Sequence, residues 1–311
     1  MDRNLALEFV RVTEAAAIAA YAWIGKGDNN AADGAAVDAM RTWFNEIPFS
    51  GKVVIGEGSK DEAPELYTGE KIGLGGAPYM DIAVDPLECT NSVAYGRYNA
   101  TSVIAAGPRG TLLSAPDTYM DKIAVGRKAK KAINLDASVA TNIKNVAKAL
   151  GKKVSDVTVI ILERDRHKSL IQEVRKAGAR VRLISDGDVA AAIATCMPDS
   201  GIDLLLGVGG STEAVLGGAA VKILGGEMYC RFKPTDAHHA NLVKKAGFNT
   251  KKIYSTEDLA KGKELMFTAT GIIDGPLLPG VLVTNDALIT HSVVVRGETS
   301  TLRYVTTHHQ R

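Results

Sequence analysis

Hydrophobic residues recur along this chain with two different periods. In the first 45 residues they return every three or four positions, which predicts amphipathic helices over about 3–24 and 31–45, with Gly25 and Gly27 between them. Short runs rich in β-branched residues come next and predict strands at about 53–55, 80–84 and 102–106. The first third of the chain therefore predicts two helices followed by strands.

From about residue 138, helical and strand-like segments alternate regularly. Four times, a helical pattern is followed by an apolar run. The helical patterns lie at 140–150, 168–177, 189–195 and 212–224, and the apolar runs that follow them lie at 157–162, 181–184, 202–206 and 227–232. Continuous apolar runs are typical of strands buried on both faces, so this rhythm predicts βαβ crossovers and a largely parallel sheet. The last stretch, about 264–306, is again richer in strands.

These patterns predict an α/β protein built from two sheet-containing halves. We expect the first half to comprise residues 1–137, with the strands from about 264–306 returning to it, and the second half to comprise residues 138–263. A chain of 311 residues is long enough for two closely apposed domains of ordinary size.

Composition narrows the class of protein. The 46% of hydrophobic and 23% of charged residues are typical of a globular chain and exclude disordered and fibrous classes. Because 37 basic and 35 acidic residues leave a net charge of +2, the balance does not favour a nucleic acid or a membrane surface as partner. The strongest basic run, residues 127–131, is interpreted as a solvated segment.

The cysteines and the early apolar run indicate the cellular compartment in which the protein is expected. Cys89, Cys196 and Cys230 are far apart and form no Cys-x-x-Cys pair, which indicates neither a disulfide framework nor a thiolate zinc site. The apolar run at 15–24 is too short to span a bilayer. We therefore expect a cytoplasmic protein in a reducing environment.

Acidic residues follow two of the predicted strands. Glu57 comes directly after the strand at 53–55, and Asp85 and Glu88 follow the strand at 80–84. Strand ends commonly open onto a ligand crevice, and carboxylates gathered there are suitable ligands for Mg²⁺ or Mn²⁺. A pair of such ions would serve the hydrolysis of a phosphate ester. The alternative is that these acids only cap helices or bond to turns.

A glycine-rich segment at 207–212 leads from a predicted strand into a predicted helix. Backbone N–H groups at such a junction readily bind phosphate, so we interpret the segment as a phosphate or sugar contact. It does not complete the Gly-x-Gly-x-x-Gly pattern of dinucleotide-binding proteins, because Thr212 occupies the last position. A nucleotide-dependent oxidoreductase nevertheless remains an alternative.

Several motifs together resemble a known family. The segment Asp85-Pro86-Leu87-Glu88-Cys89-Thr90 resembles the signature of the lithium-sensitive, metal-dependent sugar and inositol phosphatases. Further clusters in order along the chain are similar to class II fructose-1,6-bisphosphatases of the GlpX type, at 25–28, 31–33, 54–58, 61–64, 115–120, 186–188, 196–199 and 209–210. The resemblance runs from about residue 3 to residue 297.

The resemblance implies a layered α-β-α-β-α sandwich and a site with two ions, Mg²⁺ or Mn²⁺. It assigns one ion to Asp33 and Glu57, and the other to Asp85, Glu88 and Glu213. Thr90 is expected to be the catalytic hydroxyl that orients the attacking water. Asp61 is expected to assist it.

The resemblance also implies a set of substrate contacts. These are Glu88, Cys89, Thr90, Tyr119, Arg164, Asp165, Arg166, Asp186, Gly187, Asp188 and Gly210. Guanidinium groups after a strand would grip the phosphate that is not hydrolysed, whereas Asp186 and Asp188 would suit sugar hydroxyls.

The implied activity is hydrolysis of the 1-phosphate of fructose 1,6-bisphosphate, giving fructose 6-phosphate and inorganic phosphate in gluconeogenesis. The expected partner is this small sugar bisphosphate, with neither nucleic acid nor membrane involved, and the chain is expected to form a homodimer or homotetramer. Alternatives are a dual enzyme that also uses sedoheptulose 1,7-bisphosphate and an inactive sugar-phosphate-binding protein.

Two positions depart from the family pattern. Cys89 stands where the signature has glycine, and a side chain there would be strained if the backbone needs a positive φ. Asn29 stands where a basic residue is expected, so one positive charge near the site is missing.

Overall fold

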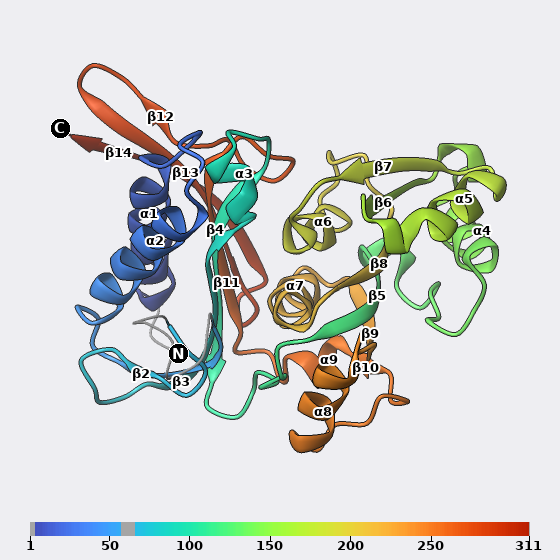
Figure 1. Cartoon of the computed structure of the whole chain (residues 1–311), viewed down its shortest axis with the longest axis horizontal. Helices are drawn as coiled ribbons and strands as arrows, with labels where there is room; N and C mark the ends of the chain where they lie inside the picture. The colour runs from blue at the N-terminus through green and yellow to red at the C-terminus, as the bar shows by residue number, and fades with distance from the viewer. Residues whose placement is uncertain (1–3, 57–65, 311) are drawn as a thin grey trace. The chain divides into compact units, whose positions relative to one another are not determined.

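The computed structural model describes residues 4–56 and 66–310 of the chain (Figure 1). The chain divides into two compact units. The first contains residues 1–114 and 262–311, and the second contains residues 115–261. Each unit has its own sheet and its own core, so the two are described in turn.

The first unit is a sheet with two long helices. The helices are α1 (Leu5–Tyr21) and α2 (Asn29–Phe44), and the short α3 (Thr90–Ala94) follows the third strand. The strands are β1 (Ser50–Ile55), β2 (Lys71–Ile72), β3 (Tyr79–Glu88), β4 (Ala100–Pro108), β11 (Met266–Ile273), β12 (Leu282–Val283), β13 (Ala287–Arg296) and β14 (Thr301–Gln310). They are ordered β12-β13-β11-β4-β3-β1-β2, with β14 paired to β13.

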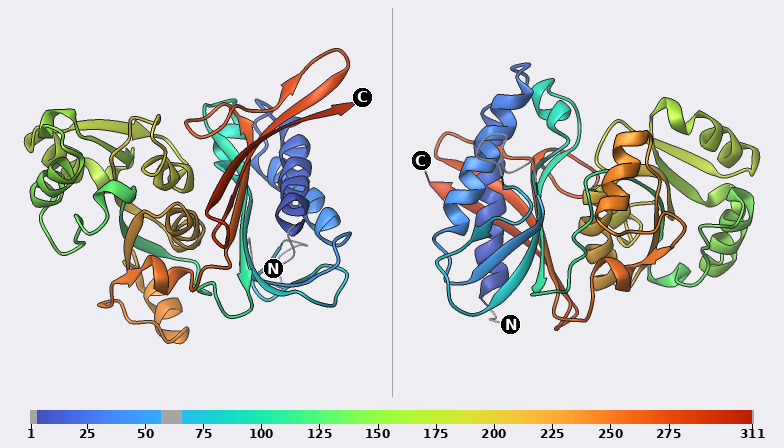
Figure 2. Two further views of the ribbon diagram at one scale, coloured as in Figure 1. Left: turned by 180° about the vertical axis from the view of Figure 1, so that it is seen from behind. Right: turned by 60° about the horizontal axis from the view of Figure 1, so that its bottom comes forward.

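Helices α1 and α2 lie side by side along one face of this sheet (Figures 1 and 2). Phe9, Phe44 and Phe49 are fully buried between helices and sheet, with ring centroids 5.4–6.1 Å apart. Burying each of these rings contributes about 2–3 kcal/mol. Strand β11 pairs with β4 on one side and β13 on the other, so the end of the chain returns to the first sheet.

The second unit has a sheet covered on both faces. Its strands are β5 (Tyr119–Val125), β6 (Thr158–Leu162), β7 (Arg180–Ile184), β8 (Leu204–Gly210), β9 (Glu227–Phe232) and β10 (Tyr254–Ser255), in the order β10-β9-β5-β8-β6-β7. Its helices are α4 (Val139–Leu150), α5 (Lys168–Lys176), α6 (Asp188–Ala194), α7 (Ser211–Ile223), α8 (Ala237–Lys245) and α9 (Thr256–Leu259), and short 3₁₀ turns occur at Arg127–Ala129, Val154–Asp156 and Asp165–His167. Helices α4 and α5 cover one face, and α6 and α7 the other (Figure 1).

The second sheet is less uniformly parallel than the alternation predicts. Strands β6, β7 and β8 are parallel, but β5 enters between β8 and β9 and runs antiparallel to both. Because β5 pairs with β8 and β9, residues 115–137 belong with the second unit, whereas the sequence pattern groups them with the first.

The α/β class and the presence of two sheets are confirmed. Within the first unit, helices lie on one face of the sheet, and within the second unit they lie on both faces, so each unit is layered. In the described parts of the chain, no helix has both the length and the apolar character needed to cross a membrane.

Candidate active site

A bulge in β3 brings two carboxylates to one face of the first sheet. Residues three apart on a regular strand point to opposite faces, as Asp85 and Glu88 would. The pairing with β4 shifts between them, since Asp85 lies opposite Val103 and Glu88 opposite Thr101. Because these partners are two residues apart, one extra residue is accommodated on β3 and both carboxylates share a face. Pro86 fits this irregularity, since it has no N–H to donate to the ladder.

Both of these carboxylates are buried and oriented by hydrogen bonds. Oδ1 of Asp85 accepts a hydrogen bond from the backbone N–H of Leu87, at 3.1 Å. Oε2 of Glu88 accepts one from the hydroxyl of Thr101, at 3.0 Å. The side chains therefore have defined positions at the end of β3.

The residue after Glu88 adopts the left-handed conformation that favours glycine. Cys89 has φ 73° and ψ 48° and caps the start of α3. A side chain costs about 1–2 kcal/mol in this conformation. Cys89 therefore has the positive φ at which a side chain is strained, as expected from the sequence. The turn also presents Thr90, whose hydroxyl donates to the carbonyl oxygen of Leu87 at 3.2 Å.

The remaining predicted groups of the first unit lie on or near α2. Asp33 is in the second turn of α2, a helix that contacts α3. Asn29, at the start of α2, donates through its side-chain amide to the amide oxygen of Asn91 on α3, at 2.8 Å. Glu57 and Asp61 lie outside the described residues.

In the second unit, the predicted substrate residues gather at one edge of the sheet. Strands β6, β7 and β8 end there, and Arg164, Asp186 and Gly210 stand at or just beyond those ends. Tyr119 joins them because β5 is antiparallel and begins where β8 ends, with Tyr119 opposite Gly210. This edge is where open α/β sheets generally bind ligands.

Arg166 and Tyr119 contact each other at this edge. The Arg166 guanidinium lies 5.2 Å from the centre of the Tyr119 ring and donates two hydrogen bonds to the carbonyl oxygen of Val208. His167 holds the same strand, since its Nε2 accepts the N–H of Val208 at 2.8 Å and its Nδ1 donates to the carbonyl oxygen of Leu162 at 2.7 Å. His167 has no other histidine near it in the sequence and was not among the predicted site residues.

The other residues of this group have different surroundings. Arg164 forms an ion pair with Asp186 and also donates to the carbonyl oxygen of Ser185. Asp165 is directed elsewhere, because its side chain is 93% exposed and pairs with Lys168 at 2.7 Å. Asp165 is thus the least enclosed of the predicted substrate contacts.

A buried cluster of charges lies beside this edge. Nζ of Lys122 on β5 is 2.6 Å from Oδ2 of Asp188, the first residue of α6, and both side chains are buried. Burial opposes the charged form of Lys122, but the carboxylates of Asp188 and Glu213 outweigh it and raise the pKa of its ammonium group. Burial, together with the charge of Asp188, raises the pKa of Glu213, and Lys122 offsets part of that effect.

Lys122 was not among the site residues predicted from sequence. A signal was present, because a lysine directly before the apolar residues 123–125 is unusual within a strand.

Glycines allow the carboxylates of this cluster to approach the backbone. A Cβ at Gly209 would lie 1.9 Å from Oδ2 of Asp188, and one at Gly210 would lie 2.0 Å from Oε2 of Glu213. Any other residue would displace these side chains. The glycine-rich segment therefore positions acidic groups, in addition to the backbone role expected from sequence.

The donor chemistry of these residues fits a hard divalent cation. Within residues 4–56 and 66–310, no three His, Cys, Asp or Glu side chains form a group that could hold a metal ion by themselves. The carboxylates of Asp85 and Glu88 in the first unit, and that of Glu213 in the second, nevertheless each offer oxygen ligands of the type that Mg²⁺ and Mn²⁺ prefer. Oε2 of Glu213 is buried and has no hydrogen-bond partner in the described structure, as expected of an oxygen that receives a cation.

Comparison with known proteins identifies the family. The model of the family described as bacterial fructose-1,6-bisphosphatase, glpX-encoded, matches residues 3–309. The chain belongs to this family. It is 44% identical to fructose-1,6-bisphosphatase 1 class 2 of Escherichia coli strain K12, over 99% of this chain and 96% of that relative. It is likewise 44% identical to the class 2 fructose-1,6-bisphosphatase of Haemophilus influenzae, over 99% of this chain and 97% of the relative.

Proposed function

We propose that this chain hydrolyses the 1-phosphate of fructose 1,6-bisphosphate, giving fructose 6-phosphate and inorganic phosphate. The observation that carries the proposal is the family match over nearly the whole chain. The carboxylates gathered by the β3 bulge, with the hydroxyl of Thr90 beside them, support it chemically. The same match favours hydrolysis over oxidoreductase chemistry.

The acidic residues would hold two divalent cations. Asp33 and Glu57 are proposed for one cation, and Asp85, Glu88 and Glu213 for the other. When bound, Mg²⁺ or Mn²⁺ would supply Lewis acidity toward the phosphoryl oxygens and lower the pKa of a coordinated water. The residues of this chain contribute fixed carboxylate geometry, set by the bulge in β3 and by the glycines before α7.

Thr90 is proposed to orient the water that attacks phosphorus. Its proton is engaged by the carbonyl oxygen of Leu87, so the lone pairs of Oγ1 remain to accept a hydrogen bond from water. A hydroxyl with an ordinary pKa does not deprotonate water alone. Thr90 therefore acts by positioning, and Asp61 is proposed to receive the proton.

The second unit supplies groups suited to the remainder of the substrate. The guanidinium groups of Arg164 and Arg166 suit the phosphate that is retained, and the Tyr119 ring supports Arg166 from one side. Asp186 and the backbone of Gly187 and Gly210 are proposed to contact sugar hydroxyls. Asp188 is buried against Lys122, so we assign it the positioning of Lys122 rather than a sugar contact.

Phosphate release from a panel of sugar phosphates tests this function. We expect rapid release from fructose 1,6-bisphosphate with Mg²⁺ or Mn²⁺ and none in excess chelator. Sedoheptulose 1,7-bisphosphate belongs in the panel, because no described residue distinguishes the two sugars. Release that is undiminished by chelator would contradict metal dependence.

A threonine variant tests the catalytic hydroxyl. Thr90→Ala is expected to lower kcat about 10²- to 10⁴-fold. Thr256→Ala is a matched control, because Thr256 is also the first residue of a short helix, α9, and has no proposed catalytic role. Equal kcat in the two variants would remove Thr90 from the mechanism.

A gluconeogenic role, a cytoplasmic location and assembly into a homodimer or homotetramer stay predictions.

A further inference from the structure

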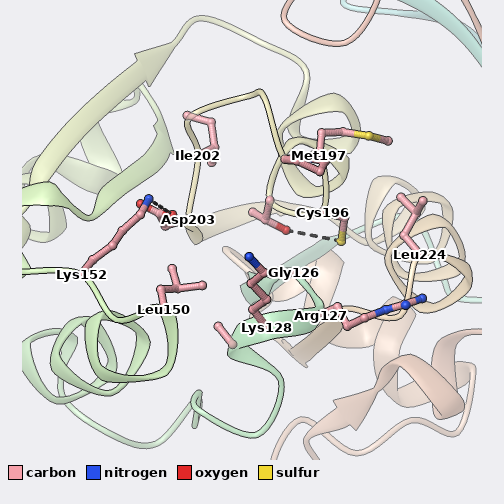
Figure 3. A pocket seen from close by; sticks show the side chains of 13 residues that line it. Gly126, Arg127, Lys128, Leu150, Lys152, Cys196, Met197, Ile202, Asp203 and Leu224 are labelled. Carbon is pink, nitrogen blue, oxygen red and sulfur yellow. Dashed lines mark hydrogen bonds and ion pairs between the residues drawn. The ribbon is translucent and has the colours of Figure 1, made fainter.

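A cavity of about 470 Å³ opens in the second unit, away from the candidate active site (Figure 3). It lies where β6 and β8 begin and where α4, α6 and α7 end. Strand β8 starts at Leu204 beside the cavity and ends at Gly210 in the candidate site, so its seven residues separate the two by about 20 Å. Among the residues that line the cavity are Arg127, Lys128, Leu150, Lys152, Ile202 and Asp203.

The charges on its wall are mainly positive. Arg127, Lys128 and Lys152 line the cavity, and Asp203 is the one acidic residue among the lining residues. Lys152 is neutralised by Asp203, with 2.6 Å between Nζ and Oδ1. In the described structure, neither Arg127 nor Lys128 is in an ion pair. Figure 3 shows the ammonium of Lys128 pointing into the cavity, whereas Arg127 extends toward Leu224.

The rest of the wall is apolar or neutral. Leu150 and Ile202 present aliphatic surface to the cavity, and Met197 and Leu224 also line it (Figure 3). Burial raises the pKa of the Cys196 thiol to about 11, so this group stays protonated at neutral pH and adds no negative charge. The cavity thus combines an apolar wall with cationic groups that have no ion-pair partner in the described structure.

We propose that this cavity binds a small organic anion, with its charged group at Lys128 and Arg127 and its apolar body against Leu150 and Ile202. Its volume lies within the range of about 300–1,000 Å³ that is usual for small-molecule sites. The basic run at 127–131, interpreted from sequence as a solvated segment, thereby gains a function in its first two residues. This inference is independent of the proposed phosphatase activity.

A pair of fluorescent probes of similar shape tests the charge requirement. Anilinonaphthalene sulfonate carries an apolar body and one negative charge, and phenylnaphthylamine is its uncharged counterpart. We expect the sulfonate to bind the full chain at one site, at least tenfold more tightly than the uncharged probe. Equal affinity for the two probes would overturn the proposal of an anion site.

Substitutions locate the probe. Lys128→Gln is expected to raise the Kd of the sulfonate about tenfold, since a charge-assisted contact is lost. Lys130→Gln is the matched control, because Lys130 is an exposed residue of the same basic run that does not line the cavity, and its Kd is expected to change less than twofold. Leu150→Trp, which fills the space, is expected to abolish binding. Unchanged affinity in both Lys128→Gln and Leu150→Trp would place the probe elsewhere and overturn the proposal.

Discussion

The two units position their acidic residues by different physical means. In the first unit, a backbone irregularity does so, since the bulge turns Asp85 and Glu88 to one face and the left-handed Cys89 presents Thr90. In the second unit the strands are regular, and a buried ionic contact between Lys122 and Asp188 sets the geometry. The first arrangement costs local strain. The arrangement in the second unit requires each buried charge to keep its partner, because an unpaired buried charge costs far more free energy than the local strain in the first unit.

Breaking the ionic contact should have the largest effect on stability. Lys122→Met leaves Asp188 and Glu213 buried without their cation, and we expect the free energy of unfolding to fall by about 3–5 kcal/mol. Urea denaturation measures this change. The control is Lys152→Met, which breaks a pair of the same length whose lysine is 39% exposed and should cost less than about 1 kcal/mol. Equal losses in the two variants would contradict the distinction between a buried and an exposed pair.

An intermediate effect is expected at His167, which joins β6 to β8 through both ring nitrogens. Burial lowers the pKa of His167 in the folded chain. The unfolded chain therefore binds a proton at this histidine near pH 6.5, where the folded chain binds it less readily. The stabilisation is therefore complete above that pH and is lost as the pH falls below it. His167→Gln should be about 1–2 kcal/mol less stable at pH 8 and less sensitive to acid.

Denaturation curves at several pH values check the role of His167. His238→Gln is the control, because His238 is exposed and its loss should leave the pH dependence of stability unchanged. If His167→Gln loses stability below pH 6.5 as steeply as the wild-type chain, the histidine is not the group responsible.

The smallest effect is expected where only backbone strain is relieved. Cys89→Gly removes a side chain from a residue with φ 73°, and we expect a gain of about 0.5–1 kcal/mol in the free energy of unfolding. Cys89→Ala retains the strain and should give no gain, and thermal denaturation distinguishes the two variants. A glycine variant less stable than the alanine variant would show that the cysteine is not strained.

Much of the fold was predictable from local pattern. The long helices, the alternating segments after residue 138 and the strand before Asp85 all have strong apolar periodicity. Strand β5 was not predicted, because it contains Asp121 and Lys122 and lacks a clear alternation. Its lysine is tolerated only because Asp188, 66 residues later, lies beside it.

The candidate site was predictable in part for a similar reason. Placing acids after strands drew attention to Asp85 and Glu88, but spacing alone assigns them to opposite faces, and only the pairing with β4 reveals the bulge. Glu213 came from family resemblance, since its first-turn position resembles ordinary helix capping. The geometry of the site therefore depends on contacts between residues far apart in the sequence, which local sequence patterns do not show.

Titration of Mn²⁺ into the chain in the presence of fructose 1,6-bisphosphate tests the central claim that these acids hold catalytic cations. We predict two Mn²⁺ ions for each wild-type chain and one for each chain of Glu88→Gln or Glu213→Gln, with phosphate release lost in both variants. Two ions retained in both variants, with phosphate release intact, would contradict the account.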